Sequence, residues 1–325
     1  MGMNRIQFQR GMSYEEFHML YGTVEQCEDA WVEARWPQGY CCPRCEGTKA
    51  SQTHNGRRLW ECLLCGYQCS SIAGTVLEAT KLPLTKWFLA MFLLTQSKNS
   101  IAALELMRQL GVSYKTAWLV KHKLLEVMAQ REATRLLTGR VEVDDAYLGG
   151  EREGKAGRGS ENKLPFVAAV QTNEKGHPIA VRLDRVKAFS KECIEAWAKN
   201  ALAASATVVS DGLWCFQAVK ATAKMHQRIV TGSGRKAAKT PEFRWVNTVL
   251  GNLKTALSGT CHAFDFKKYG HRYLAEFQYR FNRRFDLKGM LPRLLRAASL
   301  TKPHPSTKLR FSEVGNKSGK LLNCR

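Results

Sequence analysis

The stretch Val141-Glu142-Val143-Asp144 predicts a strand that ends on an acid, because valine favours extended structure. Farther along the chain, Thr207-Val208-Val209-Ser210-Asp211 ends a second extended run in the same way. A single strand-end Asp is ordinarily interpreted as a turn cap. Two such acids together can gather a divalent metal ion from distant parts of a chain, as nuclease-like folds do. The pair therefore indicates phosphodiester chemistry.

Strand alternation limits which acids near Asp144 can share that site. Glu142 and Asp144 point to one face of the strand, whereas Asp145 points to the other. We therefore expect either Asp144 or Asp145 to face the site, and not both. Glu142 would support Asp144 from the same face.

A third ligand is expected on a helix that follows Asp211, where Asn247 and Lys254 lie seven residues apart. At about 100° per residue these two side chains are about 20° from eclipsed, whereas Asn252 lies about 140° from Asn247. An amide oxygen can ligate a hard cation, although more weakly than a carboxylate. Lys254 would then bind a phosphate. The alternative for Asn247 is a cap at the start of the helix, after Trp245-Val246.

Two cysteine pairs precede these elements. They are Cys42-Pro43-Arg44-Cys45 and Cys62-Leu63-Leu64-Cys65, with 16 residues between them. Four thiolates at this spacing can close a tetrahedron around zinc. The segment between the pairs would form the hairpin of a zinc ribbon and would include Arg57, Arg58 and Trp60. The alternative is a set of unrelated buried cysteines.

The chain has 11 cysteines, and its first 20 residues lack the apolar core of a secretory signal. We therefore expect a reducing cytoplasm, where metal binding is the better interpretation of a cysteine pair. Cys41 and Cys69 break the spacing of the pairs and are assigned no ligand role. The most apolar run, residues 87–94, is eight residues long, far short of the roughly 20 that cross a bilayer. No membrane partner is expected.

The whole chain has a formal net charge of +22, and the positive charge is concentrated in its second half. Residues 1–40 hold three Arg against six acids, whereas residues 212–325 hold 23 Lys and Arg against five acids. A basic surface alone fits RNA, DNA or an acidic membrane. Its concentration after Asp211 would place a polyanion beside the predicted metal site.

Residues 100–130 predict a helix-turn-helix. A first helix is expected to end at Gly111-Val112, and Ser113 would cap a second helix. The start of that second helix, which carries Lys115 and Thr116, would enter the major groove of DNA. The alternative is a plain helical hairpin used for packing.

The remaining elements are expected around these motifs. Residues 164–172 and 178–184 predict paired strands joined by a turn at 173–176. Beyond Asp211 the chain is expected to be mostly helical. Its aromatic residues there are interpreted as core, and three neighbouring arginines as candidates for phosphate contacts. These are Arg280, Arg283 and Arg284.

A series of short motifs occurs in order over about residues 36–285. They are Trp36-Pro37 with Cys42-Pro43-Arg44-Cys45, Ala73-Gly74-Thr75-Val76, Lys81-Leu82-Pro83-Leu84, Leu110-Gly111-Val112-Ser113, Val141-Glu142-Val143-Asp144, Gly149-Gly150, Ser210-Asp211-Gly212, Trp245-Val246-Asn247-Thr248 and Tyr279-Arg280-Phe281-Asn282-Arg283-Arg284. With these motifs the chain resembles the transposases of a bacterial insertion-sequence family, the one numbered fifteen ninety-five, which have a zinc ribbon and a DDE-type catalytic domain.

The resemblance implies a ribonuclease H-like domain that uses two metal ions, usually magnesium, to nick transposon ends and join them to target DNA. On that pattern Asp144 and Asp211 are the acids of the site. Asn247 takes the place often held by Glu, as in a branch of this family, and Lys254 is the basic residue that follows it by seven. The departure from three acids makes the site a D-D-N-K version of the pattern.

We therefore expect a multidomain chain of mixed α+β and α/β class. Its parts are a helical N-terminal arm (1–40), a zinc ribbon (41–80), a helix-turn-helix region (81–135), a ribonuclease H-like mixed sheet with helices (138–290) and a basic helical C-terminal tail (291–325).

The predicted function is that of a DNA transposase. It would bind the terminal inverted repeats of its insertion sequence and catalyse end cleavage and strand transfer, with structural Zn²⁺ in the ribbon and Mg²⁺ or Mn²⁺ in the catalytic site. Its partner would be double-stranded DNA, as transposon ends and as target, on which it would form a homo-oligomer in the bacterial cytoplasm, at the nucleoid. The alternatives are a non-catalytic DNA-binding regulator with the same N-terminal modules and a structure-specific nuclease without strand transfer. The intact Asp144 and Asp211 argue against the regulator.

Overall fold

The computed structural model describes residues 6, 8–53, 58–149, 163–230, 240–261 and 264–310. These residues form two compact units. The first contains the described residues of Met1–Val127 and Arg284–Leu309, and the second contains those of Met128–Arg283 together with Arg310. Arg57, from the predicted ribbon hairpin, and residues 311–325 of the predicted tail lie outside the described residues.

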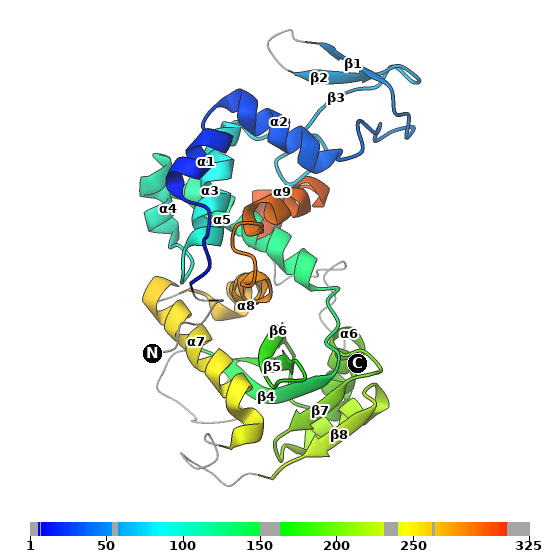
Figure 1. The fold of residues 1–325 in the computed structure, drawn as a ribbon, viewed down its shortest axis with the longest axis vertical. Coiled ribbons are helices and arrows are strands. Elements are labelled where there is room, and N and C mark those ends of the chain that lie inside the picture. The colour runs from blue at the N-terminus through cyan, green and yellow to red at the C-terminus, as the bar shows by residue number, and fades with distance from the viewer. Residues whose placement is uncertain are drawn as a thin grey trace. The chain divides into compact units, whose positions relative to one another are not determined.

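Helices make up most of the first unit (Figure 1). They are α1 (Tyr14–Tyr21), α2 (Val24–Arg35), α3 (Leu84–Gln96), α4 (Ala103–Leu110), the first part of α5 (Tyr114–Glu132), α9 (Met290–Leu300) and the short α10 (Ser306–Arg310). α2 begins with a capping box, in which Thr23 and Gln26 satisfy each other's backbone amides. Large side chains from three of these helices are fully buried in the unit, including Trp31, Phe88 and Leu124.

The helix α9 joins this unit from far along the chain. It packs against α2 and α3. Arg296 of α9 donates hydrogen bonds to the carbonyls of Ala34 and Arg35, at 2.7 and 2.9 Å. The last carbonyls of a helix have no partner within it, so a guanidinium at the end of α2 satisfies them. The first part of the predicted tail is therefore a docked helix.

A small antiparallel sheet follows α2. Its strands, in spatial order, are β1 (Ala50–Thr53), β2 (Leu59–Cys62) and β3 (Gln68–Ser70). Aromatic rings and thiols form its core: Tyr40 stacks on Trp60 with the ring centroids 5.7 Å apart and the planes at 7°. So small a sheet has little apolar surface to bury, and such scaffolds commonly depend on a structural metal.

A mixed five-stranded sheet forms the centre of the second unit. Its strands are β4 (Arg140–Leu148), β5 (Leu164–Thr172), β6 (Pro178–Arg185), β7 (Thr207–Ser210) and β8 (Met225–Arg228). Their spatial order is β6-β5-β4-β7-β8. The first three are antiparallel neighbours, whereas β7 runs parallel to β4, and β8 parallel to β7. The predicted pair of strands around the turn at 173–176 is confirmed.

The described chain beyond Asp211 is mostly helical, as expected, and the short edge strand β8 is its exception. Its four residues, Met225–Arg228, are mainly polar and mostly exposed, so they carry no alternating apolar pattern. They are extended because they pair with β7, from Thr207↔Met225 to Ser210↔Arg228. Tertiary pairing has overridden a weak local preference.

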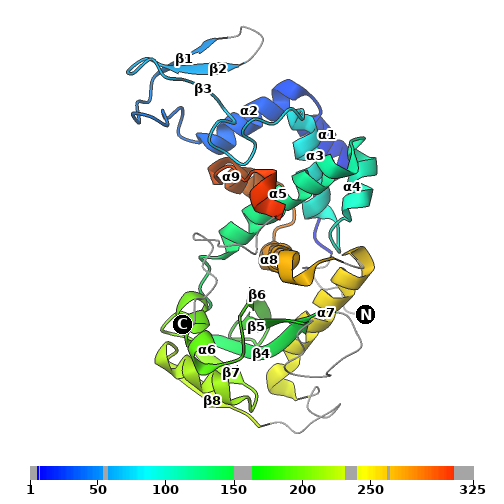
Figure 2. The ribbon, with the colours of Figure 1, turned by 180° about the vertical axis from the view of Figure 1, so that it is seen from behind.

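Helices cover both faces of the five-stranded sheet (Figures 1 and 2). One face of β4 carries Val141 and Val143, which are buried under α6 (Lys191–Ala201) and the 3₁₀ helix η1 (Trp214–Ala221). The other face carries Ala146 and Leu148, which are buried with α7 (Arg244–Cys261) and α8 (Phe266–Arg283). A mixed sheet covered in this way fits a ribonuclease H-like domain.

Side chains of α8 protect the edge of the sheet at β6. Asn282 accepts a hydrogen bond from the amide of Val181 at 2.7 Å and donates one to its carbonyl at 3.0 Å. Gln278, one turn earlier, accepts from the amide of Leu183 at 2.9 Å. The side-chain amides of Asn282 and Gln278 take the place of a neighbouring strand and block further strand pairing at this edge.

Arg283 of α8 has a structural partner instead of an exposed phosphate-binding position. Its side chain is 8% exposed, pairs with the buried carboxylate of Glu132 and lies over the ring of Tyr279. A buried guanidinium needs such partners, because an unpaired buried charge is costly. The expectation that Arg283 reaches a phosphate is therefore wrong.

Among the described residues, no helix is both long and apolar enough to cross a bilayer.

Candidate functional site

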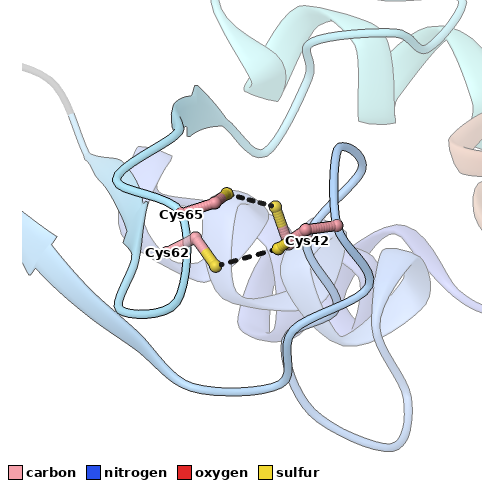
Figure 3. Close-up of side chains that lie close together, drawn as sticks. Cys42, Cys62 and Cys65 are labelled. Atoms are coloured by element: carbon pink, nitrogen blue, oxygen red, sulfur yellow. Dashed lines mark hydrogen bonds between the residues drawn. The ribbon is translucent and has the colours of Figure 1, made fainter.

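The four cysteines of the predicted ribbon converge. The sulfurs of Cys42 and Cys65 are 3.7 Å apart, and those of Cys45 and Cys62 are 3.6 Å apart. All four sulfurs lie within 4.8 Å of one another, and Figure 3 shows those of Cys42, Cys62 and Cys65 turned toward a common point. In a tetrahedron with Zn–S bonds of about 2.3 Å, the sulfurs are about 3.8 Å apart. The cluster fits a structural zinc ion.

The loops around this cluster are shaped for close approach. A Cβ at Gly47 would meet the sulfurs of Cys62 and Cys45 at 3.2 and 3.4 Å, so a glycine leaves the room that the thiols need. The pKa of Cys42 is held below its ordinary value: burial alone would raise it, but the amides of Arg44 and Cys45 donate hydrogen bonds to the sulfur. Thiolate is the form in which cysteine binds zinc.

The spare cysteines stand apart from this group. Among the described residues, the four converging sulfurs include neither Cys41 nor Cys69. Cys69 is buried opposite Trp60 on β3, and burial raises the pKa of its thiol. A neutral buried thiol serves as a small apolar side chain.

The two strand-end acids also meet. β4 and β7 are parallel neighbours, and their last pair is Val143↔Ser210. Asp144 and Asp211 each follow a member of that pair, so both lie at the same edge of the sheet. Their carboxylates are within 4.8 Å of each other, and both side chains are half-exposed. A cluster of hard oxygen donors that solvent can reach suits a divalent metal ion.

Asp145 belongs to the same group. One carboxylate oxygen from each of Asp144, Asp145 and Asp211 lies within 4.8 Å of the others. The expectation that Asp144 and Asp145 would exclude each other is therefore wrong. Asp144 and Asp145 still leave β4 on opposite faces, because β4 stays paired with β5 as far as Leu148. The pairing with β7 has ended at Val143, however, so both carboxylates can turn around that open side of β4 toward Asp211. The backbone amide of Asp145 also donates to a carboxylate oxygen of Asp144 at 2.9 Å, which draws that side chain along the strand.

The helix α7 carries the other two predicted site residues. Asn247 lies in its first turn and is half-buried, whereas Lys254 and Asn252 are exposed. The helix begins at Arg244, so Asn247 lies inside it and not at its N-cap. The alternative interpretation of Asn247 as a helix-start cap therefore does not apply.

The residue that does satisfy the start of α7 is Glu142. Its carboxylate accepts hydrogen bonds from the amides of Trp245 and Val246, at 2.9 and 3.0 Å. The sequence pattern placed Glu142 beside Asp144 on one face of β4 but missed this contact. Nothing near Glu142 in the sequence could have revealed a partner 103 residues away.

Comparison with known proteins agrees with this geometry. An ISXO2-like transposase domain matches residues 136–282, which contain the five-stranded sheet, α7 and almost all of α8. A transposase zinc-ribbon domain matches residues 22–68, which contain the four converging cysteines. An uncharacterized protein in transposable element ISH50 of Halobacterium salinarum is 26% identical over 268 residues, covering 73% of this chain and 88% of that protein.

Both matched domains belong to one group of transposases, and they occur here in a single chain in the order ribbon, then transposase domain. The ribbon contains a thiol cluster that fits zinc, and the second domain contains acids gathered at the ends of two parallel strands. The chain belongs to the IS1595 family of insertion-sequence transposases.

Proposed function

We propose that this chain is a DNA transposase that binds the terminal inverted repeats of its insertion sequence, cleaves the element's ends and joins them to target DNA. The convergence of Asp144 and Asp211 at the carboxyl ends of adjacent parallel strands carries this proposal. Phosphodiester transfer by two metal ions needs carboxylates at such a position. The substrate would be double-stranded DNA of the bacterial nucleoid, and a pair of ends would be held by a homo-oligomer.

Each residue of the site has a distinct role in this proposal. Asp144, Asp211 and Asn247 hold a pair of divalent ions, Mg²⁺ or Mn²⁺, which when bound activate the attacking oxygen and stabilise the leaving oxygen. Asp144 and Asp211 are kept in position by amides of the chain itself, from Asp145 at 2.9 Å and from Leu213 at 3.0 Å. Lys254, exposed on α7, binds a phosphate of the DNA.

Asp145 supplies charge that Asn247 lacks. An amide oxygen contributes no formal charge, so a site made of Asp144, Asp211 and Asn247 is one negative charge poorer than a site of three acids. With Asp145 in the group, three carboxylates again lie close together. We therefore assign Asp145 to the site as a third acid that attracts and holds the cations.

Recognition of the transposon ends is assigned to the zinc ribbon and to α4 and α5. α4 is followed by Gly111, which has φ 61° and ψ 47°, a left-handed conformation that suits the sharp turn of a helix-turn-helix. Ser113 accepts a hydrogen bond from the amide of Thr116 at 3.2 Å and so caps the start of α5. Lys115 is exposed in that first turn, where it can contact DNA.

Zinc should be lost when one of the two cysteine pairs is removed. We expect the purified protein to carry about one zinc ion, because four thiolates complete a structural site. Replacing both Cys62 and Cys65 by Ser should remove it, whereas Cys69→Ser, which keeps all four converging sulfurs, should not. Metal analysis by mass spectrometry measures this. Full zinc occupancy in the double variant would rule out the ligand assignment.

Catalysis should depend on the acids at the strand ends. Asp144→Asn and Asp211→Asn should each abolish cleavage of labelled transposon ends while end binding is retained, because the amide keeps the size of the side chain and an oxygen for the local hydrogen bonds. Asp145→Asn should give an intermediate loss of cleavage, since it only removes one negative charge from the group of three acids. Gel assays of cleavage and binding on the same DNA measure both properties.

Four outcomes of such assays would contradict the proposal. Cleavage retained in Asp144→Asn would exclude the metal-site assignment, and binding lost together with cleavage would make these acids structural. Absence of cleavage by the unaltered chain, with specific end binding intact, would indicate a DNA-binding regulator. Cleavage without joining to target DNA would indicate a structure-specific nuclease.

Asn247 should be nearly as important as the acids. Asn247→Ala removes an oxygen ligand and should abolish end cleavage, whereas Asn247→Asp keeps an oxygen at similar reach and should retain activity with an altered preference between Mg²⁺ and Mn²⁺. Asn252→Ala is the matched control, because Asn252 is exposed on the same helix about 140° away. Loss of cleavage in Asn252→Ala but not in Asn247→Ala would show that the third ligand is assigned to the wrong residue.

A further inference from the structure

Glu142 has a buried carboxylate whose two oxygens are both engaged by the chain. The residue is 1% exposed. One oxygen accepts from the backbone amides of Trp245 and Val246, at 2.9 and 3.0 Å. The other accepts from the guanidinium of Arg140 at 2.8 Å. A carboxylate with these partners is fully satisfied, and the converging acids of the metal site do not include it.

Arg140 extends the same contact to the segment before α7. Its second terminal nitrogen donates to the carbonyl of Glu242 at 3.2 Å, in the 3₁₀ turn η3 (Pro241–Phe243). Two side chains of β4 therefore hold the backbone on both sides of the residue where α7 begins. The first amides of a helix lack partners and carry partial positive charge, so a buried carboxylate is the complement they need.

This contact lies between two of the proposed metal ligands. Asp144 follows Glu142 by two residues on the same face of β4, and Asn247 directly follows Val246 on α7. The route from one ligand to the other therefore runs through a few residues of backbone and one set of hydrogen bonds. We propose that Glu142, braced by Arg140, is a positioning residue that sets where Asn247 stands relative to Asp144. This inference rests on the proposed role of Asn247 as a ligand.

The rest of α7 is held in another way. Val246, Val249, Leu250 and Leu253 are buried with the apolar residues of β4, β5 and β6. These side chains keep the helix on the sheet without Glu142. Loss of the carboxylate should therefore release the first turn, with Asn247 in it, while the domain stays folded.

Binding of Mn²⁺, followed by calorimetry and by electron paramagnetic resonance, tests the proposal without relying on activity. Glu142→Ala should weaken Mn²⁺ binding about 10- to 100-fold, the usual cost of losing a group that orients a ligand. Glu142→Gln should lose less, because its amide oxygen can still accept from Trp245 and Val246. In an Asn247→Ala background, Glu142→Ala should cause no further loss, since the ligand it positions is gone.

Hydrogen exchange at the amides of Trp245 and Val246 reports on the contact itself. Exchange should be slow in the unaltered protein, faster in Glu142→Ala and intermediate in Glu142→Gln. The matched control is Glu195→Gln, which removes the charge of a carboxylate paired with Lys199 on the solvent-exposed side of α6, on the other face of the sheet. That variant should change neither exchange at these amides nor the affinity for Mn²⁺.

The outcomes separate the two proposals. Unchanged exchange in Glu142→Ala would overturn the positioning role, and so would equal losses of Mn²⁺ affinity in both backgrounds. If Glu142→Ala abolished Mn²⁺ binding completely, Glu142 would be a ligand instead. If Asn247→Ala left Mn²⁺ affinity unchanged, the ligand assignment of Asn247 would fail and the role of Glu142 toward it would fail too. Faster exchange in Glu142→Ala would then identify Glu142 as a helix cap only.

Discussion

The parallel pairing of β4 with β7 is the contact on which the proposed metal site depends. Two distant segments place their carboxyl ends at one edge of the sheet, and the pair Val143↔Ser210 sets the register there. The next residue on each strand is an aspartate, so the two acids become neighbours with no other element needed. A slip of one residue would turn the side chains of β7 to the opposite faces and separate the acids.

Negative charge is concentrated at that edge, and backbone hydrogen bonds hold the acids there in positions where they can bind cations. Three carboxylates lie within 4.8 Å of one another, and like charges at this distance repel. Backbone amides of Asp145 and Leu213 hold two of these side chains in place. A bound divalent ion would relieve the remaining repulsion, so metal binding should also stabilise the domain. The same argument applies to the zinc ribbon. Its thiols lie close together in a small sheet with little apolar core, so a bound metal ion should stabilise it as well.

Local patterns predicted much of this arrangement. The cysteine spacing predicted the converging thiols, and short valine-rich runs predicted strands that end on Asp144 and Asp211, because both signals lie within a few residues. The rest depends on partners far along the chain. The polar strand β8 forms only because β7 is beside it. Asp145 joins the acids because β7 no longer covers that side of β4 beyond Val143, and Glu142 caps a helix that starts about a hundred residues later.

Crystals grown with Mn²⁺ and a transposon-end DNA would test the central claim most directly, because anomalous scattering at the manganese edge locates the ions independently of the protein. The account predicts anomalous peaks at the carboxyl ends of β4 and β7. Oxygens of Asp144 and Asp211 should be ligands, and the side-chain oxygen of Asn247 should be the third ligand from the protein. Peaks away from this edge, or peaks here with Asn247 turned away from the ions, would contradict it.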